Sequence, residues 1–119
     1  MNKIDYNILQ LGDVTLLSGE ILLKAKLAYK TYGSLNHDKS NVVLLPTFYT
    51  GTHERNEGFF GTNRVINPEK HFIISINMFG NGLSSSPSNA SPSQKGPSFP
   101  TITLWDNVCC QHKLISDHL

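Results

Sequence analysis

Cysteine and charge are both scarce in this sequence. The 119 residues contain two cysteines, Cys109 and Cys110, which are neighbours and cannot form a disulfide framework. The start of the chain has no apolar core followed by a small-residue cleavage site, so it does not resemble an export signal. These features favour the reducing cytoplasm as the location.

Long hydrophobic runs and basic clusters are also missing. No apolar stretch approaches the roughly 20 residues of a membrane-spanning helix, which argues against a membrane role. The formal net charge is +1, and the lysines and arginines are scattered, with no stripe that could neutralise a run of phosphates. Nucleic-acid binding is therefore not expected. A composition of 39% hydrophobic and 16% charged residues is typical of a single globular domain.

Two kinds of strand pattern are present. Alternate apolar residues in 25–31 predict a half-buried strand, and residues 14–17 are expected to pair with it as an antiparallel edge. The nearly continuous apolar runs 42–45 and 72–76 predict central parallel strands that are covered on both faces. Residues 54–71, between these runs, leave room for a short crossover helix.

The second half of the chain combines a long loop with a helix. Residues 78–102 are rich in Gly, Ser, Asn and Pro, and long ordered loops of this kind are often functional. Residues 103–119 predict an amphipathic helix, with Thr103 and Asp106 as a capping-box-like pair. Its expected apolar face comprises Leu104, Trp105, Val108, Cys109, His112, Ile115 and Leu119.

The expected elements do not make a closed domain. Two buried strands with one or two helices cannot cover both faces of a parallel sheet. We therefore expect residues 1–119 to be the N-terminal fragment of a single, larger α/β domain.

Several segments resemble the homoserine O-acetyltransferase family. "SGE", "LAYKTYGSLN" and a Thr-Gly after the strand 42–45 resemble the family's opening, and "NMFGNGLSSSPSNASP" followed by "FPTITLWDNVCCQ" resembles its loop and helix entry. The resemblance implies an α/β-hydrolase fold, with a mostly parallel sheet and an antiparallel edge. Residues 47–49, Thr-Phe-Tyr, depart from the family's usual His-Ala-Leu, which leaves the acyl acceptor open.

The resemblance also implies a chemistry. Such an enzyme would move an acyl group from acetyl-CoA or another acyl-CoA, as co-substrate, through an acyl-serine to a homoserine-like hydroxyl in methionine biosynthesis. It would hold no bound cofactor or metal, and a homodimer is possible for such a protein. By the match at Thr-Gly, the backbone N–H of Tyr49 would be one donor of the oxyanion hole, with Thr50 and Gly51 shaping the substrate side of the turn.

The expected catalytic triad is missing from the chain. No Gly-x-Ser-x-Gly elbow occurs, and Ser84, Ser85 and Ser86 lie in a proline-broken loop. The chain by itself is therefore expected to be inactive. Two alternatives stay open: a fragment of an esterase-like hydrolase, in which water replaces the acceptor, and a non-catalytic remnant or a module that complements a separate partner.

Weaker motifs have plainer explanations. The glycines of residues 80–85 only half match a dinucleotide fingerprint. Cys109, Cys110, His112 and His118 do not have the spacing of a known zinc site. We therefore expect the two cysteines and His112 to be buried residues of the helix. His53 and Glu54 could form an acid and base pair, although solvated loop residues are commoner, and a capping role is the simpler account of the Asp106 carboxylate.

Overall fold

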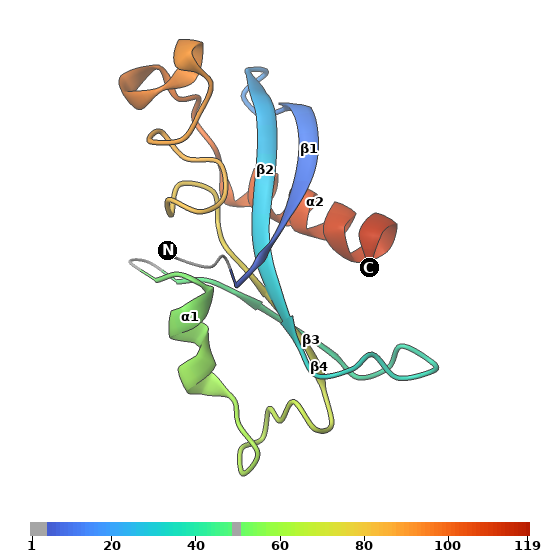
Figure 1. The fold of residues 1–119 in the computed structure, drawn as a ribbon. Coiled ribbons are helices and arrows are strands. Elements are labelled where there is room, and N and C mark those ends of the chain that lie inside the picture. The colour runs from blue at the N-terminus through green and yellow to red at the C-terminus, as the bar shows by residue number, and fades with distance from the viewer. Residues whose placement is uncertain (1–4, 49–50) are drawn as a thin grey trace.

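The computed structural model describes residues 5–48 and 51–119. They form a four-stranded sheet with helices on both faces (Figure 1). The strands are β1 (Asn7–Thr15), β2 (Ile21–Tyr32), β3 (Val42–Pro46) and β4 (Phe72–Ile76). The α-helices are α1 (His53–Asn56) and α2 (Leu104–Lys113), the latter continued by a π-helical turn, η4 (Leu114–His118). Short 3-10 turns are η1 (Glu57–Phe59), η2 (Pro92–Gln94) and η3 (Gly96–Ser98).

The strand order is β1-β2-β4-β3. β1 pairs antiparallel with β2, β2 pairs antiparallel with β4, and β3 pairs parallel with β4. The antiparallel edge and the parallel pair expected from the sequence are confirmed. β1 begins earlier than expected, and the segment after Thr15 turns through Gly19 rather than continuing the strand.

The main core lies between the sheet and the end of α2. Leu27 and Tyr29 of β2 and Ile74 and Ile76 of β4 pack together with Leu114. Successive residues of a strand point to opposite faces, so Ser75 faces the other side. There its hydroxyl accepts a hydrogen bond from Asn56 of α1, at 2.9 Å. The two helices therefore cover opposite faces of the sheet.

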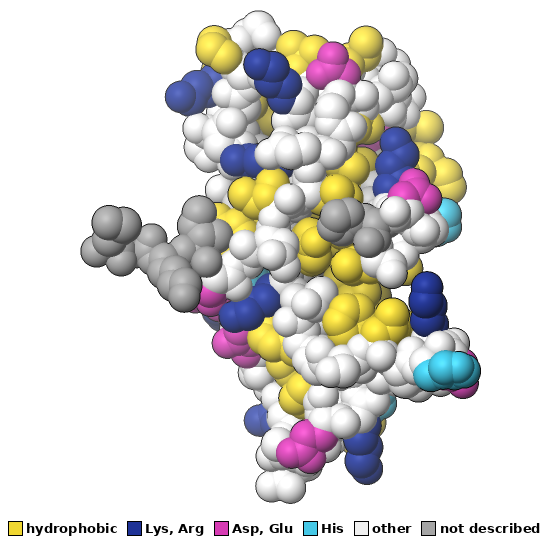
Figure 2. All heavy atoms as spheres, turned by 45° about the vertical axis from the view of Figure 1, so that its right-hand side comes forward, with side chains coloured by type: hydrophobic (Ala, Val, Ile, Leu, Met, Phe, Trp, Pro, Cys, Tyr) yellow, Lys and Arg dark blue, Asp and Glu magenta, His cyan; other side chains and the backbone are white. Residues whose placement is uncertain are grey.

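The expected burial of both faces of β3 is wrong for the described residues. Val42 and Leu44 keep 39% and 37% of their surface exposed. Leu44 pairs with Ile74 and so shares its face, but the core cluster around Leu114 includes residues of β2 and β4 and none of β3. Figure 2 shows hydrophobic side chains reaching the surface across the middle of the molecule.

The expected apolar face of the helix is confirmed only at its end, where Ile115 and Leu119 pack against the main core, and is wrong for its first two turns. Leu104, Trp105 and Val108 are 73%, 60% and 54% exposed. The face turned toward the rest of the molecule is mostly polar: Asp106, Asn107, Cys110, Gln111 and, beyond the helix, Leu114. Asp106 and Asn107 accept hydrogen bonds from the backbone N–H groups of Leu17 and Phe79, and the Gln111 amide donates to the sulfur of Met78, so the buried polar groups have partners.

The start of α2 shows how this works. Thr103 and Asp106 form the expected capping box, and Asp106 also accepts a hydrogen bond from the backbone N–H of Leu17, at 2.8 Å. Burial acts to raise the pKa of the Asp106 carboxyl, but hydrogen bonds from Thr103 and Leu17 outweigh it and hold the pKa below its usual value. Asp106 therefore ties α2 to the β1–β2 turn.

Candidate functional site

The two loops that follow the parallel strands β3 and β4 enclose a hollow of about 570 Å³. Its position, beyond the carboxyl ends of neighbouring parallel strands, is where α/β sheets collect ligands. The residues that line it are Thr47, Phe48, Gly51, Thr52, Met78, Phe79, Gly80, Asn81 and Leu104.

The loop after β3 is fixed at both ends. The Thr47 N–H donates to the Ile76 carbonyl at 2.9 Å, and the Thr47 hydroxyl accepts from the Met78 N–H at 3.0 Å. The Gly51 N–H donates to the carbonyl of Phe48 at 2.9 Å. A Cβ on Gly51 would lie 3.1 Å from the Phe48 ring, so a glycine lets the ring lie close to the backbone.

Two of the three predicted site residues, Tyr49 and Thr50, lie outside the described residues. The oxyanion-hole role of the Tyr49 N–H thus stays a prediction. Gly51 does line the hollow. Because its own N–H is bound to Phe48, Gly51 contributes space and curvature to the site and no free donor.

Asn77, between β4 and the lining residue Met78, connects several segments through its side chain. It is fully buried, and its side-chain oxygen accepts from the N–H of His53 at 3.0 Å and from the amide of Asn81 at 2.8 Å. Its amide nitrogen lies 3.1 Å from both the Ala28 carbonyl and the Nδ1 atom of His53. Asn77 thereby joins β2, α1 and the loop after β4. Sequence reasoning missed it, although a polar residue directly after a buried apolar strand was a usable signal.

The same contacts define the state of His53, which is 1% exposed. Since the Asn77 oxygen serves two donors, its amide nitrogen faces Nδ1 and donates to it. Nδ1 therefore accepts, and the proton of the neutral ring lies on Nε2. Nε2 has no hydrogen-bond partner among the described residues and lies 3.5 Å from Oδ1 of Asp5. His53 is not among the residues that line the hollow, and its hydrogen bonds join α1 to Asn77.

Asp5, His53 and Glu54 offer ligand atoms within 4.8 Å of one another, which invites comparison with a cation site. A metal on Nε2 would need that atom free of its proton, whereas Asn77 places the proton there. The Lys30 ammonium also lies 3.2 Å from the Asp5 carboxylate and, by this hydrogen bond above all, lowers the pKa of Asp5. The cluster is thus better described as an ion pair covering a buried histidine.

The serines of the long loop are bound to β2. The hydroxyls of Ser84 and Ser85 accept from the N–H groups of Ala28 and Lys26, each at 2.8 Å. Ser84, Ser85 and Ser86 are all buried. Ser84 and Ser85 take the place of a strand partner for β2, whereas the Ser86 hydroxyl accepts from Gly82 and donates to the Ser84 carbonyl within the loop. The half-matched dinucleotide fingerprint lies in this segment, and no helix begins there.

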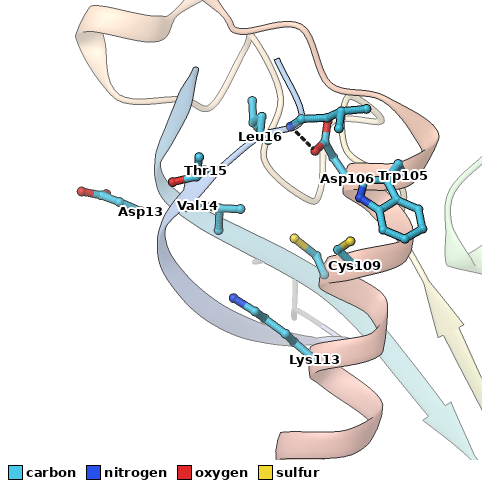
Figure 3. A pocket seen from close by; sticks show the side chains of 10 residues that line it. Asp13, Val14, Thr15, Leu16, Trp105, Asp106, Cys109 and Lys113 are labelled. Atoms are coloured by element: carbon cyan, nitrogen blue, oxygen red, sulfur yellow. Dashed lines mark hydrogen bonds between the residues drawn. The ribbon is translucent and has the colours of Figure 1, made fainter. Parts of the chain in front are cut away.

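A second hollow, of about 430 Å³, lies between α2 and the end of β1 (Figure 3). Cys109 and Lys113 extend from α2 toward Val14 and Thr15 of β1, and Trp105 also lines the hollow. Both cysteines are free thiols, Cys109 exposed and Cys110 buried. The expectation that both would be buried helix residues is therefore wrong for Cys109.

The two thiols should differ in reactivity. Burial raises the pKa of Cys110 to about 11, and nearby Cys109 and Asp106 add to the effect against Lys113. Because the thiolate is the reactive form, we expect iodoacetamide at pH 8 to alkylate exposed Cys109 at least about tenfold faster than Cys110. Fragment-ion mass spectrometry of the peptide that contains both residues measures the two rates. In urea the rates should converge, and equal rates in the folded protein at pH 8 would contradict the assignment.

Comparisons with known proteins agree with this geometry. The chain is 39% identical over 118 residues to an ethyl acetate hydrolase of Pseudomonas veronii, covering 98% of this chain and 34% of that protein. The structure of an acetylester hydrolase from Corynebacterium glutamicum superposes with a TM-score of 0.90 at 41% identity, covering 96% of this chain and 33% of the other. A homoserine O-acetyltransferase of Chlorobium chlorochromatii is 35% identical over 105 residues, covering 82% and 29%. No protein-family model matches the chain.

These likenesses define the class of the protein. The chain has part of an α/β-hydrolase fold, as the sequence led us to expect. The resemblance to homoserine O-acetyltransferases is confirmed, and it extends with higher identity to ester hydrolases. The chain spans about a third of the length of the curated relatives it matches. Among the described residues, no helix is long and apolar enough to cross a membrane.

Proposed function

We propose that this chain forms the oxyanion-loop part of an enzyme that hydrolyses acetyl esters. The observation that carries the proposal is the joint likeness in sequence and structure to an acetylester hydrolase, with a TM-score of 0.90. The hollow at the ends of β3 and β4 supports it, because the loop after β3 in such folds supplies one oxyanion donor.

The chemistry is acyl transfer through an acyl-serine. A serine oxygen outside this chain would attack the ester carbonyl, and its proton would pass to the leaving alcohol through a histidine base. Water would then attack the acyl-serine and release acetate, restoring the serine. In this mechanism the chain would supply the Tyr49 N–H, which donates a hydrogen bond to the negative oxygen of the tetrahedral intermediate. The loops after β3 and β4 would line the surrounding site.

Homoserine acetylation is the second candidate. The 35% identity to a homoserine O-acetyltransferase favours it. In that reaction, acetyl-CoA would be the co-substrate and the hydroxyl of homoserine would replace water in the second step. Both reactions need the same oxyanion loop. They differ in the nucleophile that attacks the acyl-serine, which is water in hydrolysis and the homoserine hydroxyl in acetylation.

The test begins with the protein as its gene encodes it, purified from its native source. Its intact mass shows whether this segment occurs with the nucleophile, because a complete domain of this fold should be about three times 13.2 kDa. Acetate release from ethyl acetate and CoA release from acetyl-CoA with homoserine are then measured side by side. We expect hydrolysis of ethyl acetate to dominate. Homoserine-dependent CoA release without ester hydrolysis would favour the transferase, and a mass near 13.2 kDa with neither activity would favour a non-catalytic module.

A further inference from the structure

The hollow beside the oxyanion loop is lined by neutral groups alone. Its larger side chains are those of Phe48, Met78, Phe79 and Leu104, and none of the lining residues is ionisable. Tyr49 and Thr50, which lie outside the described residues, are of types that carry no charge at neutral pH. Ligand sites of this composition bind hydrocarbon and use polar groups only for orientation.

Most polar groups around the hollow already form hydrogen bonds within the protein. The N–H of Phe79 donates to the side chain of Asn107, and that of Gly80 donates to the carbonyl of Ser85, each at 2.9 Å. The Thr47 hydroxyl already accepts from Met78, and the Gly51 N–H is bound to Phe48. An ammonium or carboxylate placed here would lose its water and gain little in return.

Two charged groups beside lining residues, Arg55 and Asp106, do not change this picture. The Arg55 guanidinium lies 5.5 Å from the centre of the Phe48 ring, where it stacks on an aromatic wall. The Asp106 carboxylate, two residues after Leu104, is occupied by the backbone of Thr103 and Leu17. A positively charged ligand would therefore lie near the Arg55 guanidinium, and no carboxylate lines the hollow.

We propose that this hollow receives the alcohol part of the ester and selects uncharged hydrocarbon groups, with Leu104 as a specificity-determining residue at its rim. The proposal rests on the proposed function. An acetyl group needs room only for one methyl, so a hollow of about 570 Å³ is better matched to the alcohol side. The same wall would disfavour homoserine, whose ammonium and carboxylate would both be desolvated.

Two acetate esters of nearly equal shape test the proposal on the complete protein. 3,3-Dimethylbutyl acetate and acetylcholine differ mainly in the replacement of a carbon by a charged nitrogen. We expect kcat/KM to be at least about tenfold higher for the neutral ester, because a desolvated charge without a partner is costly. Equal values, or a preference for acetylcholine, would overturn the proposal.

A matched pair of variants locates the effect. Leu104→Glu places a carboxylate at the rim, and we expect it to shift the ratio of the two kcat/KM values about tenfold toward acetylcholine. Val108→Glu is the control: Val108 lies one turn further on the same helix, is exposed, and lines neither hollow. A ratio unchanged by Leu104→Glu, or changed equally by both variants, would count against Leu104.

The two proposals fail in different ways. If the complete protein hydrolyses neither these esters nor ethyl acetate, the proposed function is wrong and the specificity proposal falls with it. If it hydrolyses ethyl acetate but treats the two matched esters alike, the function stands and only the specificity proposal is wrong. The wild-type ratio decides this even if Leu104→Glu fails to fold.

Discussion

Replacing Tyr49 by proline in the complete protein should lower kcat for ethyl acetate by about 100-fold, the typical loss when one oxyanion-hole donor is removed. Proline has no backbone N–H, so the change removes the donor assigned to this position. KM should change much less, because the interaction forms chiefly in the transition state.

Tyr49→Ala is the matched control for this prediction. It removes the whole side chain but keeps the backbone N–H, so kcat should stay within a few-fold of wild type. Circular dichroism and thermal unfolding of both variants show whether they keep the secondary structure and stability of the wild type. If the alanine variant loses as much activity as the proline variant, the side chain rather than the N–H carries the effect.

Replacing Gly33 by alanine should destabilise the fold by about 3 kcal/mol or more, because two costs add. Gly33 follows β2 with φ at +79°, a conformation that disfavours a side chain. A Cβ there would also lie 2.2 Å from the His71 carbonyl oxygen and 2.5 Å from that of Pro68. Since both neighbours are backbone atoms, relief requires movement of the whole turn before β4. The midpoint of urea unfolding measures the loss.

Gly19→Ala separates the two costs. Gly19 also has a positive φ, +92°, but a Cβ on it would meet nothing within 4 Å. Only the backbone strain remains, which is worth about 1–2 kcal/mol. Gly33→Ala should therefore unfold at clearly lower urea than Gly19→Ala. Similar midpoints for the two variants would mean that the turn of residues 67–71 yields easily.

Local patterns were sufficient to predict most of the elements. Period-two alternation identified β2, apolar runs identified β3 and β4, and the pair Thr103 and Asp106 marked the start of α2. Each of these signals depends on interactions within a few residues or on one repeating period. The short sequence motifs around the Thr-Gly of residues 50–51 also indicated the homoserine O-acetyltransferases, to which the chain is similar.

The orientation of α2 could not be predicted in the same way. Its apolar residues at helical spacing favoured burial of Leu104, Trp105 and Val108, yet the structure leaves them exposed. The opposite face is buried because Asn107 accepts from the N–H of Phe79 and Asp106 from that of Leu17. Such partners are 28 and 89 residues away, and no local pattern announces them.

The candidate site, like the fold, has some features that neighbouring residues determine and others that depend on tertiary contacts. The sequence by itself determined that a glycine-bearing loop follows a strand of a parallel pair, and that no nucleophile elbow occurs in the chain, because both are properties of neighbouring residues. Only the tertiary structure decided that the loops after β3 and β4 share one neutral hollow, and that Asn77 holds them against β2 and α1. The physical reason is that a buried amide must satisfy its donors and acceptors with whatever the fold brings near it.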